Sequence, residues 1–221
     1  MEDFSRQRDL FDPETFHTPV HVLGCGGTGS FVALFLAKLG IKDITIYDFD
    51  KVEEHNLPNQ LFGVYDVEKP KVEALCDIIT DSTMTAVVTK FARVTGEQRL
   101  SGIVFMLTDT MKSRKDIWEK AIKMKPAVQL LIETRMGLSE GRIYTINPAN
   151  LDQIKMYEET LYSDDETPVS ACGTSQSVIT TAVTIAGMAV RQLINFHNGV
   201  DLNHEILLDL ENNQIFVRRF V

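Results

Sequence analysis

The sequence has few cysteines, and no two of them are close together. Cys25, Cys76 and Cys172 are the three among 221 residues, and no CxxC spacing occurs. A disulfide framework or a four-cysteine zinc site needs paired cysteines at short spacing, so neither is indicated. We therefore expect no structural zinc, and a reducing, cytoplasmic location.

Basic residues are also scarce. The chain has 22 Lys and Arg against 31 Asp and Glu, a net charge of −9 and a pI of about 5.0. A protein whose main task is to bind a nucleic-acid backbone needs a surplus of positive charge. We therefore expect no nucleic-acid partner.

The sequence also lacks a long uninterrupted apolar run. Its opening stretch, MEDFSRQRDLFDPE, is charged and has no apolar core, unlike a secretory signal. The most apolar long segment, 178–194, is rich in Thr and Ala and contains Arg191. Because it falls short of the ~20 residues of a bilayer span, we expect a buried helix and no membrane partner.

Short apolar runs alternate with helical patterns along the chain, which is typical of βαβ units on a parallel sheet. Strands are expected at 19–24, 43–50, 85–94, 102–109, 127–135 and 141–148. Helices are expected at 30–40, 69–80, 111–124 and 174–196, and a final hairpin at 205–220. We predict one α/β domain over 1–221: a Rossmann-like, mainly parallel sheet flanked by helices, with C-terminal antiparallel strands.

The segment 150–171 differs from the rest. It contains MYEETLYSDDETPVSA, which is acidic, aperiodic and longer than most connections in compact domains. We predict a mobile crossover loop within the domain.

The stretch VLGCGGTGS places glycines between the first expected strand and helix, at Gly24, Gly26, Gly27 and Gly29. Glycines there bring a phosphate close to backbone N–H groups at the positive end of the helix dipole. Asp48, at the end of the second strand, is close to the ~20-residue spacing of a carboxylate that binds a ribose hydroxyl. The pattern indicates an adenosine ligand, but dehydrogenases, flavoproteins and methyltransferases share it.

Further motifs narrow the choice. The stretch after the second strand contains Asp48, Asp50, Val52, Asn56, Leu57, Gln60 and Lys71. FSRQ precedes the glycines, LTDTMKSR follows a later strand, and VSACGTSQSVITTAVTIAGMAVRQLI comes before the end. In this order the motifs resemble the ThiF/MoeB/HesA group of the ubiquitin-activating enzyme superfamily, over nearly the whole chain.

The resemblance implies an ATP-dependent adenylyltransferase. Its substrate would be the C-terminal carboxylate of a small ubiquitin-like or sulfur-carrier protein ending in glycine, with release of pyrophosphate. The implied cofactors are ATP and Mg²⁺. The implied nucleotide-binding residues are Gly24, Gly26, Gly27, Gly29, Asp48, Asp50, Asn56, Gln60 and Lys71.

Four residues carry catalytic expectations. Lys71 would supply positive charge to the phosphates, and Asp109, at the end of a strand, would hold magnesium. The resemblance implies that Arg6 reaches the ATP of the other subunit of a homodimer, and that Cys172 forms a covalent intermediate. The simpler alternatives are a solvated Lys71, an Asp109 that caps a helix, an Asn56 and Gln60 that cap turns, and a Cys172 that only packs.

One departure from the family pattern leaves other functions open. Asn59 stands where the family has an arginine, and an arginine on a transferring phosphoryl group can be worth ~10³ to 10⁵ in rate. Arg6, Arg114 or Arg135 could replace it. Without replacement, the chain would be a binding subunit that docks a carrier without catalysis. A nicotinamide-dependent oxidoreductase is the third possibility.

Overall fold

The computed structural model describes residues 2–163 and 177–220, which form one eight-stranded sheet. Its strand order is β3-β2-β1-β4-β5-β6-β7-β8. The first five strands run parallel: β1 (Val20–Leu23), β2 (Ile44–Asp48), β3 (Val88–Phe91), β4 (Gly102–Met106) and β5 (Val128–Met136). The last three are antiparallel: β6 (Glu140–Ile146), β7 (Glu205–Asp209) and β8 (Gln214–Arg218). The predicted fold class is confirmed.

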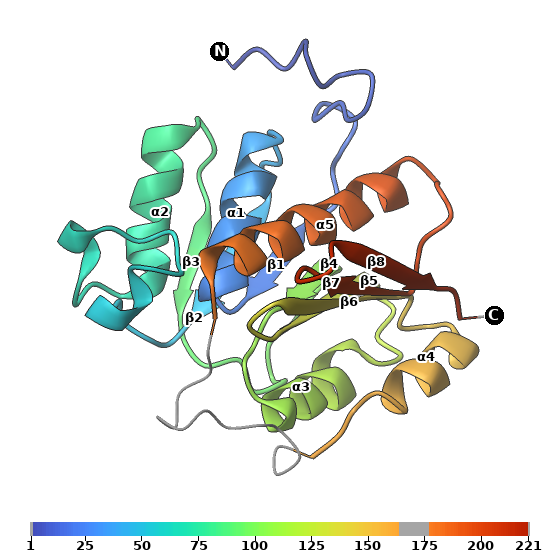
Figure 1. The fold of residues 1–221 in the computed structure, drawn as a ribbon. Coiled ribbons are helices and arrows are strands. Elements are labelled where there is room, and N and C mark those ends of the chain that lie inside the picture. The colour runs from blue at the N-terminus through green and yellow to red at the C-terminus, as the bar shows by residue number, and fades with distance from the viewer. Residues whose placement is uncertain (1, 164–176, 221) are drawn as a thin grey trace.

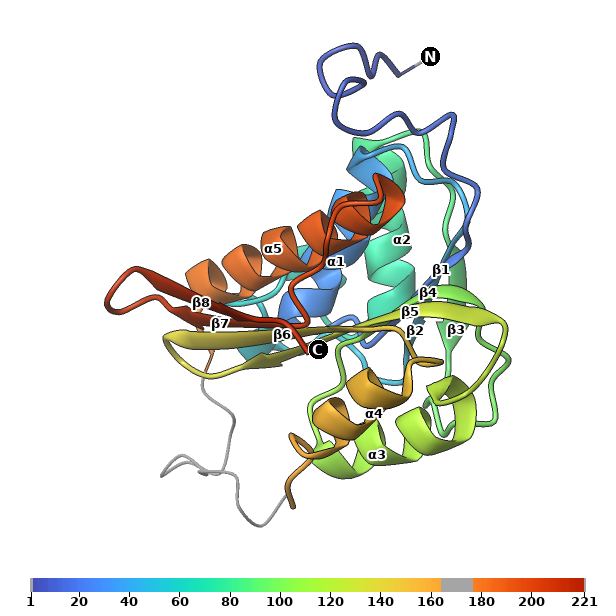
Figure 2. The same ribbon diagram turned by 90° about the vertical axis from the view of Figure 1, so that its right-hand side faces the viewer.

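Helices cover both faces of the sheet (Figures 1 and 2). One face carries α1 (Gly27–Lys38), α2 (Lys71–Ser82) and α5 (Ile179–His197). The other carries α3 (Met111–Ile117), which continues as a π-helix over Trp118–Ile122, and α4 (Leu151–Glu158). Two short 3₁₀ turns, Glu54–Asn56 and Val64–Asp66, lie between β2 and α2.

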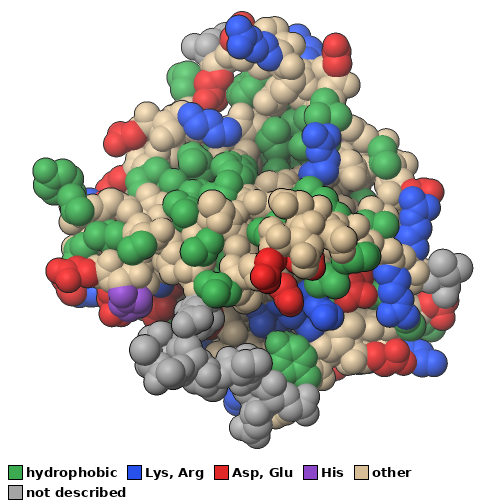
Figure 3. Space-filling model, viewed as in Figure 1, with side chains coloured by type: hydrophobic (Ala, Val, Ile, Leu, Met, Phe, Trp, Pro, Cys, Tyr) green, Lys and Arg blue, Asp and Glu red, His purple; other side chains and the backbone are tan. Residues whose placement is uncertain are grey.

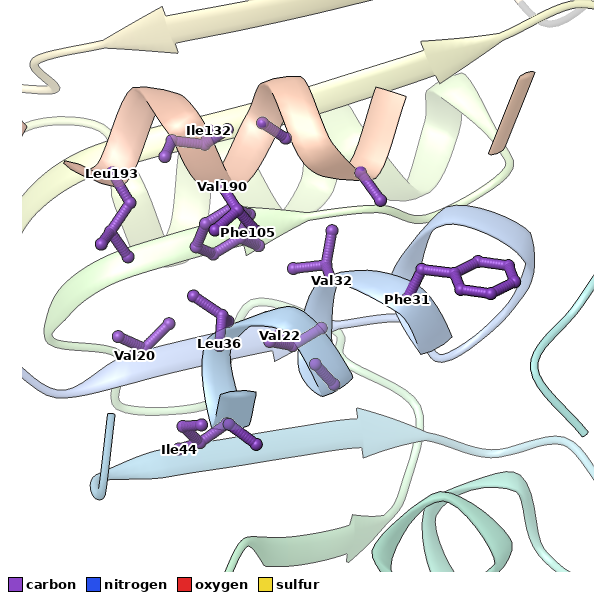
Figure 4. Close-up of a cluster of buried hydrophobic side chains, with 14 of the residues drawn as sticks. Val20, Val22, Phe31, Val32, Leu36, Ile44, Phe105, Ile132, Val190 and Leu193 are labelled. Atoms are coloured by element: carbon purple, nitrogen blue, oxygen red, sulfur yellow. The ribbon is translucent and has the colours of Figure 1, made fainter. Parts of the chain in front are cut away.

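Alternate residues of the central strands fill two separate cores. Val20 and Val22 of β1 pack toward α1 and α5, whereas Leu23 packs on the α3 and α4 side. Because both faces are covered, β4 is apolar throughout and β1 is apolar except for His21, as expected of a buried parallel sheet. Figure 4 shows the first core, where Leu36 of α1 and Val190 and Leu193 of α5 meet the strand residues.

The helix α5 matches the buried helix expected at the C-terminal end of the chain. It is the one helix of the described residues that is long and apolar enough, by length and composition, to cross a membrane. Its buried residues, among them Ala182, Ile185 and Leu193, belong to the first core, and the helix packs on α1, β5 and β6.

The crossover segment 150–171 is partly helical, which corrects the expected loop. Asn150 caps α4, because its side-chain oxygen accepts hydrogen bonds from the backbone N–H groups of Asp152 and Gln153. Ile154 and Tyr157 of α4 are buried in the second core. Two apolar positions one turn apart are too few to give a visible helical period in an acidic stretch. Residues 164–176 lie outside the described part of the chain.

Candidate functional site

The glycine loop joins β1 to α1 at the carboxyl edge of the sheet. Gly24 has a φ of +101°, and a Cβ there would lie 2.8 Å from the carbonyl oxygen of Leu107. A Cβ on Gly29 would lie 1.9 Å from the carbonyl oxygen of Gly24, so the first turn of α1 packs directly on the loop. Only glycine allows this approach, which brings the loop backbone to the end of β4.

The start of α1 is open to an anion. Gly26 is its N-cap residue, and no side chain of the described residues caps the helix. The first N–H groups of a helix have no partner within the helix, and they carry the positive end of its dipole. A phosphate placed there would accept hydrogen bonds from these N–H groups.

Asp48 ties the glycine loop to the end of β2. Its Oδ2 accepts a hydrogen bond from the Cys25 backbone N–H at 2.7 Å, and its Oδ1 accepts one from Asp50 at 2.8 Å. Burial raises the pKa of Asp48, while these two bonds act in the opposite direction. Each carboxylate oxygen has a second lone pair, so a ribose hydroxyl can still bind. The sequence did not indicate this positioning role.

Cys25, inside the loop, is buried, and its thiol is unreactive. It has no exposed surface, and burial raises the pKa of its thiol well above the ordinary value. The thiolate that a nucleophile requires is therefore disfavoured at this position.

Lys71 is the first residue of α2 and is 7% exposed. Its Nζ lies 3.5 Å from Asp50 Oδ2, and its backbone N–H donates to the carbonyl of Asp50 at 2.9 Å. The alternative of a solvated lysine is therefore wrong. Lys71 therefore lies beside Asp50, and its charge also acts on Asp48, whereas the nucleotide-binding role of all three stays a prediction.

The segment 56–61 runs beside the start of α1, where the backbone N–H of Leu61 donates to Ser30 Oγ. Asn56 caps the first 3₁₀ turn, because its Oδ1 accepts from the Glu53 N–H at 3.0 Å. This supports the turn-capping alternative for Asn56, and a ligand contact there stays a prediction.

Three buried side-chain oxygens near the glycine loop have no hydrogen-bond partner among the described residues: Asn59 Oδ1, Gln60 Oε1 and Thr108 Oγ1. The Asn59 carbonyl lies 3.6 Å from the Cβ position of Gly27, and Thr108 N lies 3.5 Å from that of Gly24. Buried polar atoms are rarely left unpaired, so their gathering here fits a polar ligand. Thr108 is a site residue that the sequence placed only within a motif.

Asp109 follows β4 at the same edge and is exposed. The N-cap of α3 is Thr110, whose side chain accepts from the Ser113 N–H, so the helix-capping alternative for Asp109 is wrong. Within the described ranges, no three His, Cys, Asp or Glu side chains cluster closely enough to hold a metal. Magnesium often binds through one or two carboxylates plus substrate phosphates, a donor set that Asp109 and a nucleotide would provide.

Two of the three candidate replacements for the missing arginine are engaged elsewhere. Arg114 Nε lies 3.0 Å from Glu133 Oε1, and Arg135 Nε donates to the same oxygen at 2.7 Å. All three residues are buried, and Arg135 also donates to the carbonyl of Thr160. Burial would lower the pKa of Arg135, but Glu133 outweighs it and raises the pKa. The two arginines and Glu133 form a buried ion cluster between α3 and β5, and neither arginine is free to contact a phosphate.

Arg6 is exposed and far from the glycine loop of its own chain. Its neighbours Phe4 and Gln7 contact Gly40 and the carbonyl of Leu39, beyond the C-terminal end of α1 (Figures 1 and 2). The length of α1, about 18 Å, separates this end from the loop. Arg6 therefore cannot act within one subunit. Cys172 lies outside the described residues.

A groove of about 250 Å³ lies beside this N-terminal segment, between α1 and α5, and is lined in part by Gln7, Lys38 and Arg191. Figure 3 shows hydrophobic side chains gathered over the same two helices, with acidic and basic side chains interspersed around them. The groove lies at the end of α1 away from the glycine loop, so it is separate from the candidate site.

Comparison with known sequences gives a match over almost the whole chain. A model of the ThiF family matches residues 8–220. The sulfur carrier protein ThiS adenylyltransferase of Escherichia coli (strain K12) is 24% identical over 209 residues, 88% of this chain and 76% of that protein. The molybdopterin-synthase adenylyltransferase of the same strain is 30% identical over 103 residues, 46% of this chain and 39% of that protein.

Solved structures share the fold. E. coli MccB, in a crystal structure with ATP, has a TM-score of 0.71 at 18% identity, covering 94% of this chain and 65% of that chain. PaaA has a TM-score of 0.72 at 20% identity, covering 94% of this chain and 66% of that chain. The chain thus spans about two thirds of the length of these structures.

Proposed function

Because the chain belongs to the ThiF family, we propose that it uses ATP to adenylylate the C-terminal carboxylate of a small carrier protein. The observation that carries the proposal is the set of groups gathered at the carboxyl edge of the sheet. There, buried Lys71, the uncapped start of α1 and the unpaired oxygen of Thr108 surround the glycine loop. Positive charge and donors at one place suit a triphosphate.

The reaction follows from this arrangement. A carboxylate oxygen of the carrier attacks the α-phosphorus, and the bond from that phosphorus to the oxygen bridging to the β-phosphate breaks. Pyrophosphate leaves with the electron pair, and no proton is transferred. Lys71 and the N–H groups at the start of α1 offset the charge of two anions brought together. Magnesium, held by Asp109, would add to this neutralisation.

The carrier is proposed from the relatives. Two of them are named as adenylyltransferases for the sulfur carrier ThiS and for molybdopterin synthase. We take the partner to be a small sulfur-carrier or ubiquitin-like protein with a C-terminal glycine. We also propose a homodimer, because Arg6 lies about one helix length from the loop of its own chain and only a second subunit could bring it there.

A second candidate function rests on Asn59. Arg114 and Arg135 are both paired with Glu133, so within one subunit neither takes the place of the family arginine. If the partner subunit does not supply Arg6, the chain would bind carrier and nucleotide with little turnover. The nicotinamide-dependent alternative is not carried forward, because the family match favours adenylylation.

Product analysis distinguishes the two candidates. The protein, ATP with magnesium and a carrier ending in Gly-Gly are incubated, and intact mass is measured for a carrier that has gained AMP. An adenylate formed over many turnovers supports the enzyme. Carrier binding with no adenylate above the Asp109→Ala background supports the binding subunit. No binding of any candidate carrier contradicts both.

A further inference from the structure

A stacked pair of side chains lies beside the candidate site and has no part in the roles described so far. The guanidinium carbon of Arg93 lies 3.6 Å from the ring centroid of Phe49. Phe49 is 42% exposed, stands between Asp48 and Asp50, and belongs to neither hydrophobic core. Arg93 is exposed as well. The pair therefore presents a partly exposed guanidinium and aromatic surface next to two site carboxylates.

The backbone fixes the pair at the edge of the sheet. Phe49 follows the last residue of β2, and Arg93 follows β3, with Asp48 and Phe91 in register across the two strands. The N–H of Ala92 donates to the carbonyl of Asp48 at 3.0 Å. Val94, on the other side of Arg93, is buried in the second core. Arg93 is therefore held by residues that also position Asp48.

The strand order decides which part of a nucleotide would reach this pair. In the order β3-β2-β1-β4, the glycine loop follows β1 and Asp48 ends β2. The proposed function requires that ATP places its phosphates at the start of α1 and its ribose on Asp48. The base of ATP then lies beyond β2, on the side of the sheet away from β1. The next strand outward is β3, where Arg93 and Phe49 lie.

The geometry points to Arg93, held over the ring of Phe49, as the surface on which the base of ATP stacks and by which a purine is preferred to a pyrimidine. A guanidinium plane stacks on aromatic faces, which a lysine ammonium does not do. A purine offers the larger face, so it gains more from this surface. This inference rests on the proposed function only for the placement of ATP.

The test is direct binding, measured by calorimetry with ATP, CTP and inorganic tripolyphosphate. Arg93→Lys keeps the charge and removes the plane, Arg93→Gln removes both, and Phe49→Leu removes the support. All three substitutions should weaken ATP binding about tenfold and reduce the preference for ATP over CTP. Arg93→Lys, which keeps the charge, should bind tripolyphosphate as tightly as the wild type does. Arg99→Lys, an exposed arginine on the same connection, is the matched control and should bind ATP as the wild type does.

Two results would overturn the inference. One is wild-type ATP affinity in Arg93→Lys and Phe49→Leu. The other is an equal loss of ATP and tripolyphosphate affinity in Arg93→Gln with full recovery in Arg93→Lys, which would make Arg93 a phosphate cation. Thermal unfolding of each variant identifies any general loss of fold. A wild type that binds ATP but never adenylylates a carrier would end the proposed function and leave this inference standing.

Discussion

At the scale of single residues, Asp48 positions two backbone segments with one carboxylate. Both of its oxygens accept backbone N–H bonds, one from the glycine loop and one from Asp50. Asp48→Asn would turn an amide N–H toward one of these donors, leaving a buried N–H unpaired. We expect a loss of ~1–3 kcal/mol of unfolding free energy together with weaker ATP binding. Urea unfolding measures the first, and the exposed Asp81→Asn is the control; equal stability of the two variants would contradict the positioning role.

His21 makes stability depend on pH. It is buried on β1, with Tyr47 Oη 3.3 Å from Nδ1 and Ser101 Oγ 3.5 Å from Nε2. Burial lowers its pKa, whereas the nearby Asp43 acts in the other direction. Because the unfolded chain then binds the proton more readily, this part of the stability is present above the unfolded pKa of about 6.5 and is lost as pH falls below it.

Urea unfolding between about pH 7.5 and 5.5 tests this. The free energy of unfolding should fall with pH in the wild type and fall less in His21→Gln. The exposed His55→Gln should keep the wild-type slope. A His21→Gln slope as steep as that of the wild type would place the proton uptake elsewhere, for instance at His204, whose pKa burial also lowers.

The residues of the site were predictable from the sequence to different degrees. The resemblance implied that Lys71, Asp48 and Asp50 serve one site, and the structure places them at one edge of the sheet, where Asp48 ends β2 and Lys71 begins α2. The resemblance could not show that Arg114 pairs with Glu133, since that contact joins α3 to β5 and forms only in the folded chain. The stacking of Arg93 on Phe49 was hidden for the same reason.

At the scale of elements, two glycines in the turn from β1 to α1 differ in how much space a side chain would have. A Cβ at Gly29 would meet the carbonyl of Gly24 at 1.9 Å, while a Cβ at Gly26 meets nothing within 4 Å. Gly29→Ala should therefore displace the loop and reduce ATP affinity more than tenfold, about 1.4 kcal/mol or more. Gly26→Ala should lose less ATP affinity than Gly29→Ala, because its Cβ displaces no atom of the loop. Nucleotide titration checks both, and a reversed order would contradict the described loop.

Most elements were predictable because their periods are strong. The central strands β1 and β4 are buried along their whole length, and the long helix α5 has a clear buried side. α4 was missed because its two buried residues are surrounded by charge. β3 is shorter than expected, 88–91 within the predicted 85–94, and three of its four residues are exposed at the edge of the sheet. Polar context and edge position weaken the sequence pattern in both cases.

At the scale of the whole molecule, the position of Arg6 requires a second subunit if it acts at all. Arg6→Ala and Lys71→Ala chains should each be inactive alone. Mixed dimers would contain one site with an intact Lys71 and an Arg6 from the partner, so part of the adenylylation activity should return. Subunit exchange is verified by mass on differently tagged chains. Mixed dimers that form without regaining activity would contradict action in trans.

The central claim is that the edge of the sheet around the glycine loop activates a carboxylate with ATP. Carrier-dependent exchange of labelled pyrophosphate into ATP tests it most directly. The wild type should catalyse exchange only when a cognate carrier ending in Gly-Gly is present. Lys71→Ala should lose about 10² or more of the rate, the scale of one electrostatic contact, whereas the exposed Lys42→Ala should keep it. Exchange that persists in Lys71→Ala, or nucleotide binding that responds to NAD and not to ATP, would contradict the claim.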